Sequence, residues 1–262
     1  QEKFHKTVLR QKPFVEKAYT LIAFGKMEQE YLVKLKWNPR IEVIHNAVIT
    51  NSTTREKMCS QTFAVYQKVL DSNVLEQMDD DTQQLMASII KAGTLGDARW
   101  VEPALPETID WRRMFIYAEH QNIRNYVDYG INILGISAIS LDTEHLPAYF
   151  PENYQRPQSI KKLIGEYKGN ETEYLVHMIQ QIEKQPLMLH LIEFTRELYR
   201  DTVNDDLLQE ALEEKKLTKY ASRLMQVLHE LTLLDEGYMP IEPLDDRGTQ
   251  KIRESITNHL KI

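Results

Sequence analysis

The stretch at residues 20–44 constrains the fold most, because its apolar pattern changes period twice. Residues 20–24, TLIAF, form a short apolar run typical of a strand that is buried on both faces. Residues 26–36 then follow a helical period, and residues 41–44, IEVI, return to strand-forming residues. A strand, a helix and a strand within about 30 residues predict a β-α-β unit with two parallel strands and a right-handed crossover.

Amphipathic helices dominate the sequence that follows this unit. Apolar residues recur there at three- and four-residue steps, and residues that favour helix starts, such as Asp110 and Asn170, precede the apolar stripes. We therefore predict a mainly α fold, a multi-helix array or bundle with a small N-terminal β-α-β unit. The expected boundary separates a β-α-β segment at residues 1–52 from a helical domain at residues 53–262.

Three of the expected helices carry specific predictions. Glycines are common just after helix ends, so Gly93 with Gly96 and, later, Gly130 are expected to end two helices. In the predicted helix of the β-α-β unit, the apolar stripe is Met27, Tyr31 and Leu35. The helix that starts near Thr53 is expected to bury the following side chains: Cys59, Phe63, Tyr66 and Leu70.

Charge and cysteine content exclude several functional classes. The net charge of −7, with basic residues scattered along the chain, argues against nucleic acid or an anionic membrane as a partner. A single cysteine excludes disulfide scaffolds and cysteine-based zinc sites. The first ten residues lack the apolar core of a signal peptide, and no apolar run approaches the roughly 18 to 20 residues that cross a bilayer. A cytoplasmic protein without a membrane span is therefore expected.

Residues 18–48 resemble the end of the first domain of GT-B glycosyltransferases, in particular the large family-4 type of retaining enzymes. The matching residues are Ala18, the run Leu21-Ile22-Ala23, the run Glu30-Tyr31-Leu32 and the run RIEVIHNAV at residues 40–48. Gly25 replaces a common serine, and His45 and Ala47 replace the usual proline and glycine beside Asn46. The resemblance contains none of the family's catalytic residues, which leaves the catalytic residues of this chain unknown.

This resemblance implies a C-terminal part or accessory helical domain of a bacterial glycosyltransferase. In the complete protein, sugar would pass from a sugar-nucleotide to a glycan acceptor, and residues 1–262 alone are expected to be inactive. Either the chain is a fragment of a longer protein, or the unit has been kept without its sheet. A homo-oligomer formed through the open edges of the N-terminal strands is a further possibility. The alternative function is a non-enzymatic helical protein-interaction domain.

One irregular segment, at residues 144–156, offers candidate ligand-binding residues. Tyr149 could stack on a sugar ring, and the side chains of Glu144, His145 and Arg156 could hydrogen-bond to it. The alternative interpretation is a proline- and aromatic-rich loop that covers the helical core. Glu144 and Glu152 also match the E-x7-E spacing with which family-4 enzymes hold the sugar-nucleotide, but the residues between them include two prolines and lack a glycine-rich entry.

Metal and cofactor sites are not expected. Asp79-Asp80-Asp81 has the D-x-D spacing of some metal-dependent glycosyltransferases, but it leads directly into a helical pattern, where acids favour the helix start. The eight histidines form no H-E-x-x-H motif, and the nine glycines form no phosphate-binding loop.

Overall fold

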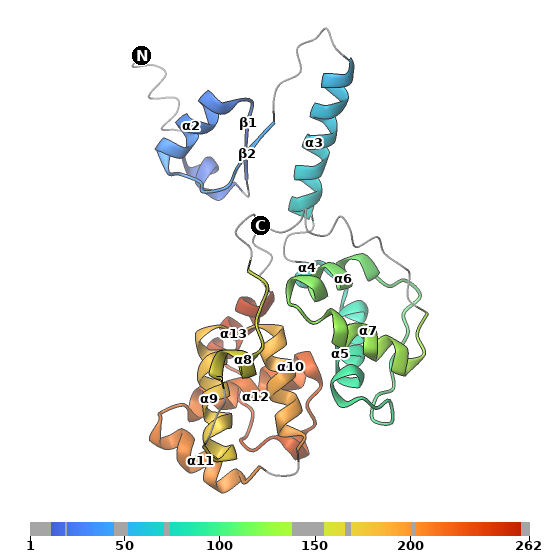
Figure 1. Cartoon of the computed structure of the whole chain (residues 1–262), viewed down its shortest axis with the longest axis vertical. Coiled ribbons are helices and arrows are strands. Elements are labelled where there is room, and N and C mark those ends of the chain that lie inside the picture. Colours follow the sequence, from blue (N-terminus) through green and yellow to red (C-terminus); the bar gives the residue numbers. More distant parts are fainter. Residues whose placement is uncertain are drawn as a thin grey trace. The chain divides into compact units, whose positions relative to one another are not determined.

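The structure is a computed structural model that describes residues 12–18, 20–44, 52–70, 74–137, 155–165, 169–200 and 203–257 (Figure 1). The fold is mainly α, as the sequence predicts: 67% of the described residues lie in helices, and these residues form one small parallel sheet near the N-terminus. Two compact units divide the chain: an N-terminal unit, Gln1–Ser72, and a helical unit, Asn73–Ile262. The boundary between the units therefore lies after the helix at residues 52–70, which the sequence analysis had assigned to the helical domain.

The N-terminal unit contains the β-α-β arrangement that the sequence predicts. Strands β1 (Leu21–Ala23) and β2 (Ile41–Val43) pair in parallel, with Leu21 opposite Ile41. Helix α2 (Lys26–Leu35) connects them and ends at Lys36, whose backbone is left-handed. The predicted stripe of α2 is largely uncovered, because Met27 is 86% exposed.

Asn38 fixes the approach to β2. Its buried side-chain amide donates hydrogen bonds to the carbonyl oxygens of Val15, at 3.0 Å, and Ala18, at 2.6 Å. Its side-chain oxygen accepts the backbone N–H of Arg40 at 2.9 Å. Because buried polar groups are costly unless they are hydrogen-bonded, this asparagine ties the short helix at residues 12–17 to the loop before β2.

Helix α3 (Ser52–Leu70) buries a different face from the one predicted. Cys59 is exposed, and the side chains of Phe63 and Tyr66 are 68% and 61% exposed. The less exposed residues of α3 are Met58, Thr62, Val65 and Val69, whose spacing is also helical. The buried face is thus displaced by one residue, or about 100° around the helix axis, because the predicted stripe followed the largest apolar residues.

The helical unit packs its helices around one hydrophobic core, formed from residues between Val74 and Ile256. Helix α5 is central, since it packs against α7, α10 and α12. The elements are α4 (Val74–Gln77), α5 (Asp80–Leu95), α6 (Trp111–His120), α7 (Arg124–Leu134), α8 (Ile160–Ile164), α9 (Glu171–Lys184), α10 (Met188–Leu198), α11 (Asp205–Glu214), α12 (Thr218–Thr232), η2 (Glu236–Tyr238) and α13 (Arg247–Thr257).

Side-chain caps confirm several predicted helix starts in this unit. Asp79 accepts the backbone N–H of Thr82 at the start of α5, and Asp110 accepts that of Arg113 at the start of α6. Asn170 caps α9 in the same way. Each cap satisfies one backbone donor that has no partner within the helix.

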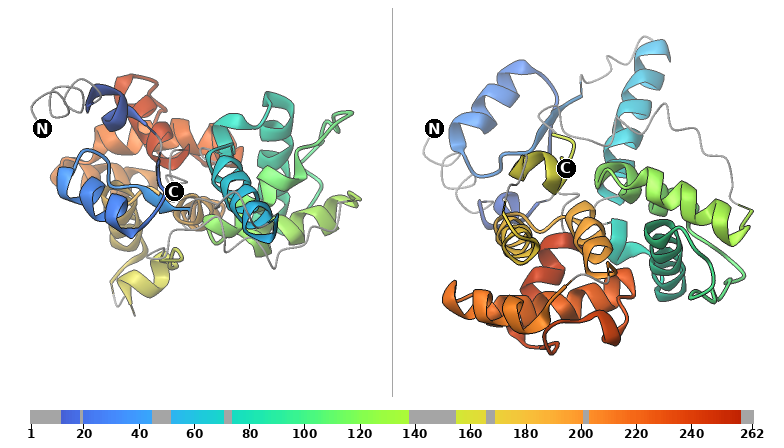
Figure 2. Two further views of the ribbon diagram at one scale, coloured as in Figure 1. Left: turned by 90° about the horizontal axis from the view of Figure 1, so that it is seen from above. Right: turned by 60° about the horizontal axis from the view of Figure 1, so that its bottom comes forward.

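Two of the glycines predicted to end helices instead allow two helices to touch. Gly93 and Gly130 lie inside α5 and α7, which run side by side (Figure 2). A Cβ atom added at Gly93 would lie 2.0 Å from the carbonyl oxygen of Tyr126, and one added at Gly130 would lie 2.0 Å from that of Ile89. Gly96, in contrast, ends α5 with a left-handed backbone, as predicted.

Candidate functional site

Of the four ligand-binding residues predicted from the sequence, the structure describes one. Glu144, His145 and Tyr149 lie outside the described residues, as does Glu152. Arg156 lies in the segment at residues 155–159 that precedes α8. Its guanidinium is paired with the carboxylate of Glu119, at the end of α6, with a distance of 3.1 Å between Nη2 and Oε2.

Two hydrogen bonds, one at Pro157 and one at Ile160, hold the segment that carries Arg156. The side-chain amide of Asn122, in the turn between α6 and α7, donates to the carbonyl oxygen of Pro157 at 2.9 Å. The backbone N–H of Ile160 donates to Oε2 of Glu193, on α10, at 2.7 Å. The segment is therefore attached to two parts of the helical unit that are distant in sequence.

His190 adds a third attachment from α10. Its ring is fully buried, with Nε2 3.0 Å from the carbonyl oxygen of Gln158 and Nδ1 3.1 Å from that of Gln185. Carbonyl oxygens only accept hydrogen bonds, so a neutral imidazole, which carries one N–H, can donate to one of the two. Both contacts are hydrogen bonds only when the ring is doubly protonated.

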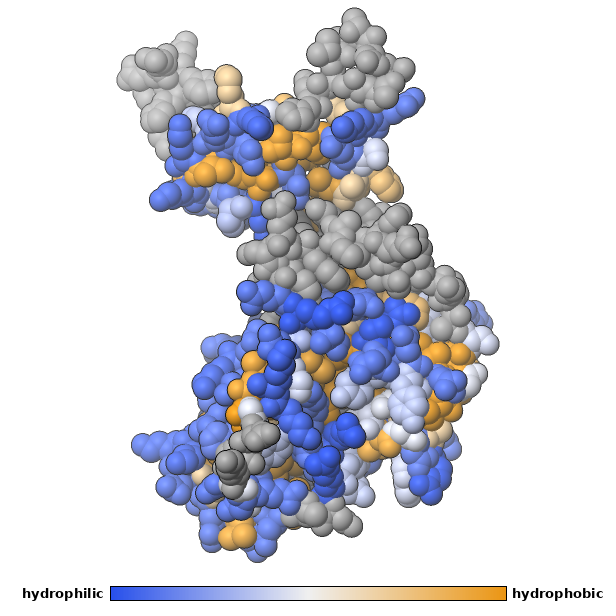
Figure 3. Space-filling view, viewed as in Figure 1, coloured by the Kyte–Doolittle hydropathy of each residue, from blue (hydrophilic) through white to orange (hydrophobic). Residues whose placement is uncertain are grey.

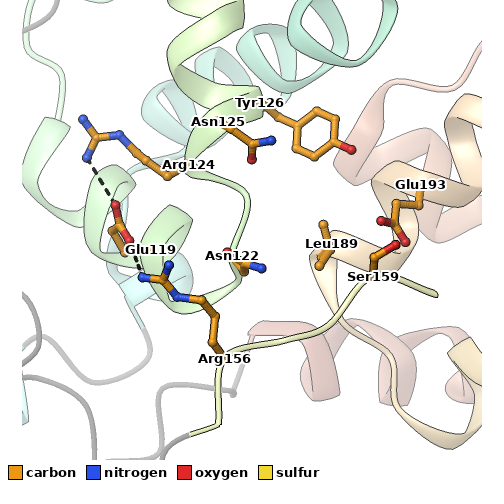
Figure 4. A pocket seen from close by; sticks show the side chains of 9 residues that line it. All are labelled: Glu119, Asn122, Arg124, Asn125, Tyr126, Arg156, Ser159, Leu189 and Glu193. Atoms are coloured by element: carbon orange, nitrogen blue, oxygen red, sulfur yellow. Dashed lines mark hydrogen bonds and ion pairs between the residues drawn. The ribbon is translucent and has the colours of Figure 1, made fainter. Parts of the chain in front are cut away.

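Glu119 lies between two arginines. Besides Arg156, Nη1 of Arg124 lies 4.0 Å from Oε1 of Glu119 (Figure 4). The Arg124 guanidinium is itself fixed, because its Nε donates to Asp128 at 2.7 Å and its Cζ lies 3.9 Å from the centre of the Phe115 ring. Its Nη1 atom is buried and makes no hydrogen bond within the described part of the chain.

These groups border a cavity of about 400 Å³, which we call the Glu119 cavity. Figure 4 shows Asn122 between Arg156 and the α7 residues, with Leu189, Ser159 and Glu193 at the opposite side. The lining contains two arginines and two glutamates together with amide and hydroxyl groups, so its formal charge is balanced. Such a lining offers hydrogen-bond donors and acceptors without a strong electric field.

Tyr126 lines the cavity, and its ring is directed toward Glu193 on α10 (Figure 4). Burial of its ring, followed by the nearby Glu193 carboxylate, raises the pKa of its hydroxyl. The hydroxyl therefore stays protonated at neutral pH and remains able to donate a hydrogen bond.

The D-x-D motif has the structural role that the sequence analysis favours. Oδ1 and Oδ2 of Asp79 accept hydrogen bonds from the backbone N–H and the hydroxyl of Thr82, at 2.7 and 3.0 Å. The backbone N–H of Thr82 is the main cause that lowers the pKa of Asp79. Among the residues that the structure describes, no three histidine, cysteine or acidic side chains are grouped as metal ligands.

The sequence analysis identified Arg156 but missed the residues around it. Glu119 lies 37 positions away and Glu193 contacts the segment across 33 positions, so no local spacing connects them. One local signal is Asn122, whose φ of 56° places it in the left-handed region that asparagine tolerates. An asparagine between two helical patterns is typical of a turn, so Asn122 could have been used to predict the turn between α6 and α7.

Comparisons with protein-family models, curated proteins and solved structures found no match to this chain. Among the described residues, no helix has both the length and the apolar character needed to span a membrane.

Proposed function

We propose that this chain is part of a glycosyltransferase. In this proposal, residues 1–52 belong to the end of its first nucleotide-binding-type domain, and the helices that follow form an accessory module. The proposal rests on the residues quoted above for the family-4 resemblance. The residues of this resemblance that are typical of a strand, a helix and a strand lie at β1, α2 and β2.

The observation that carries the proposal is the uncovered apolar surface of the N-terminal unit. Parallel strands are normally buried on both faces, and two strands alone are marginally stable. Here Phe14 is 76% exposed and Met27 is 86% exposed, and Phe24, directly after β1, is exposed as well. Figure 3 shows apolar surface on the face of this unit that is turned to the viewer. Further strands or helices, as in a larger nucleotide-binding-type domain, would cover these side chains, whereas Ala23 and Ile44 are already buried.

The Glu119 cavity supports the same proposal from the helical unit. Saccharides present many hydroxyl groups, each of which both donates and accepts hydrogen bonds. The carboxylate, amide, hydroxyl and guanidinium groups of the cavity match that pattern.

The test is sugar transfer by the natural protein that contains this chain. We expect that protein to release nucleoside diphosphate from at least one donor in a panel of UDP-, GDP- and dTDP-sugars and to label a glycan acceptor. Residues 1–262 alone should show no turnover, because the resemblance includes none of the family's catalytic residues. Turnover by residues 1–262 that a point change within them abolishes would contradict this division, and a natural protein that neither binds nor turns over any donor would refute the assignment.

The exposed face of α3 favours a second candidate function, a non-enzymatic helical protein-interaction domain. Phe63 and Tyr66 are large, lie on one face of α3 and are mostly exposed. Under this alternative, replacing both by serine should abolish binding to a defined partner. The Gln61→Ser variant, changed at an exposed position on another face of the same helix, should still bind.

A further inference from the structure

The Glu119 cavity is one of three neighbouring hollows of the helical unit. Tyr126 and Glu193 line both this cavity and a small one of about 90 Å³. The small one shares Lys161, Tyr174 and Arg200 with a wider hollow of about 820 Å³ beside α8 and the start of α9. The three hollows therefore adjoin one another, with the shared side chains between them, and we call them together the groove.

The charge of the lining changes along this groove. At the Glu119 cavity two arginines face two glutamates, whereas Lys161, Lys162, Arg196 and Arg200 line the hollows beyond Tyr126. We call that part the basic arm. The complete lining carries six cationic and four anionic side chains, in a chain whose net charge is −7. A locally positive groove on a negative protein concentrates anionic ligands.

Carboxylates of this lining are already engaged within the protein. Glu119 is paired with Arg156, as described above. Oε2 of Glu193 accepts the backbone N–H of Ile160, and Oε2 of Glu197 lies 2.5 Å from Nη1 of Arg200. Two of these carboxylates are thus paired with arginines of the same lining, while Lys161 and Lys162 are exposed on α8.

Two tyrosines are spaced along the groove, Tyr126 at the junction and Tyr174 in the basic arm. Burial, followed by the neighbouring glutamates, raises the pKa of the Tyr174 hydroxyl, as it does for Tyr126. Each therefore offers an uncharged hydroxyl and an aromatic ring, the combination that holds a hydroxylated ring by stacking and hydrogen bonding.

We propose that this groove binds an acidic saccharide. Its neutral ring hydroxyls bind in the Glu119 cavity, and its carboxylate or phosphate group binds in the basic arm at Lys161, Lys162 and Arg200. The expectation of a saccharide rests on the proposed function, whereas the expectation of a negative charge rests on the lining of the basic arm.

Titration calorimetry on residues 1–262 tests the proposal with four probes: a neutral tetrasaccharide, a tetrauronate, a hexose 6-phosphate and inorganic phosphate. We expect one of the two acidic saccharides to bind about fivefold more tightly than the neutral one, the effect of one exposed ion pair. The tetrauronate and the hexose phosphate distinguish a carboxylate from a phosphate, and added salt should reduce the preference.

Two variants and a control locate the binding. Lys161→Gln with Lys162→Gln should remove the preference for the acidic saccharide and leave the neutral one bound as before. Arg156→Gln should weaken both. Lys184→Gln, at the exposed end of α9 and outside the groove lining, should change neither. Circular dichroism verifies that each variant is folded.

Each contrary result has a separate meaning. Equal affinity for neutral and acidic saccharides, or a preference that survives the double lysine change, refutes the role of the basic arm. Inorganic phosphate that binds as tightly as the acidic saccharides refutes the saccharide part, and no binding of any probe refutes the site. Donor turnover by the natural protein is measured independently, so a failure of the proposed function remains distinguishable from a failure of this inference.

Discussion

At the scale of single residues, Asp246 shows how one carboxylate can hold a chain turn. Its Oδ1 accepts hydrogen bonds from the backbone N–H groups of Gly248 and Thr249, at 2.7 and 3.2 Å, at the start of α13. Nε and Nη2 of Arg223, on α12, donate to its two oxygens at 2.7 and 2.6 Å. Arg223 is the main cause that lowers the pKa of Asp246 far below its ordinary value, and the backbone donors add to the shift.

This lowered pKa predicts a specific acid sensitivity. Because the folded state favours the ionised carboxylate, its contribution to the free energy of unfolding is present above the ordinary pKa of 3.8 and is lost as the pH falls below it. We expect Asp246→Asn to be less stable than the wild type at pH 7, and the difference to shrink by pH 3. Urea unfolding at both values measures this. Glu242→Gln, at an exposed position, should follow the wild-type curve. A deficit in Asp246→Asn that is equal at both values would contradict the assigned role.

Among the elements, the crossing of α5 and α7 positions the candidate site. Arg124, Asn125 and Tyr126 form the first turn of α7, so any displacement of this helix moves one wall of the Glu119 cavity. Gly93 permits the close approach because its missing Cβ leaves room for the carbonyl oxygen of Tyr126. The helices can therefore meet closely only if this position lacks a side chain.

The Gly93→Ala substitution tests that crossing. In an isolated helix alanine would be favoured by about 1 kcal/mol, but here the added methyl group would overlap backbone atoms of α7. We expect a net loss of about 1 to 3 kcal/mol in the free energy of unfolding, typical of overpacking. Gly237→Ala is the matched control, since nothing lies within 4 Å of its added Cβ. Stability equal to or above that of the wild type in Gly93→Ala would show that α5 and α7 are not in contact there.

The elements were predictable from sequence where the signal is local. The period changes predicted β1, α2 and β2, and single polar residues such as Asp110 and Asn170 predicted helix starts. Gly93 was misread because a glycine that ends a helix and one that admits a neighbouring helix have the same local sequence pattern. The buried face of α3 was misread because the size of apolar residues does not reveal which face has a packing partner.

For the whole molecule, the class of fold was predictable but the groove was not. A mainly α architecture follows from periodicity, which each segment carries by itself. The groove takes its walls from the turn after α6, the segment before α8 and one face each of α9 and α10. Its contacts join residues more than 30 positions apart, and their formation depends on how the helices pack. Among the described residues of the site, Arg156 was the one that the sequence analysis had predicted.

The account of the whole chain depends on the claim that the β-α-β unit is not complete by itself. The strands are joined by few hydrogen bonds, among them those from the N–H of Leu21 to the carbonyl oxygen of Arg40 and from the N–H of Ile44 to that of Ala23, both at 2.9 Å. In the same unit Phe14 and Met27 are exposed, although a self-sufficient protein would bury such residues against its strands.

Amide hydrogen exchange at residues 21–24 and 41–44 of the isolated chain, followed over a range of protein concentrations, tests this claim most directly. An incomplete sheet predicts fast exchange, or protection that grows with concentration as the strands of two copies pair. The amides of α5 and α10 provide the internal reference, because they belong to the core of the helical unit and should stay protected throughout. Strong protection of the strand amides that does not depend on concentration would contradict the account.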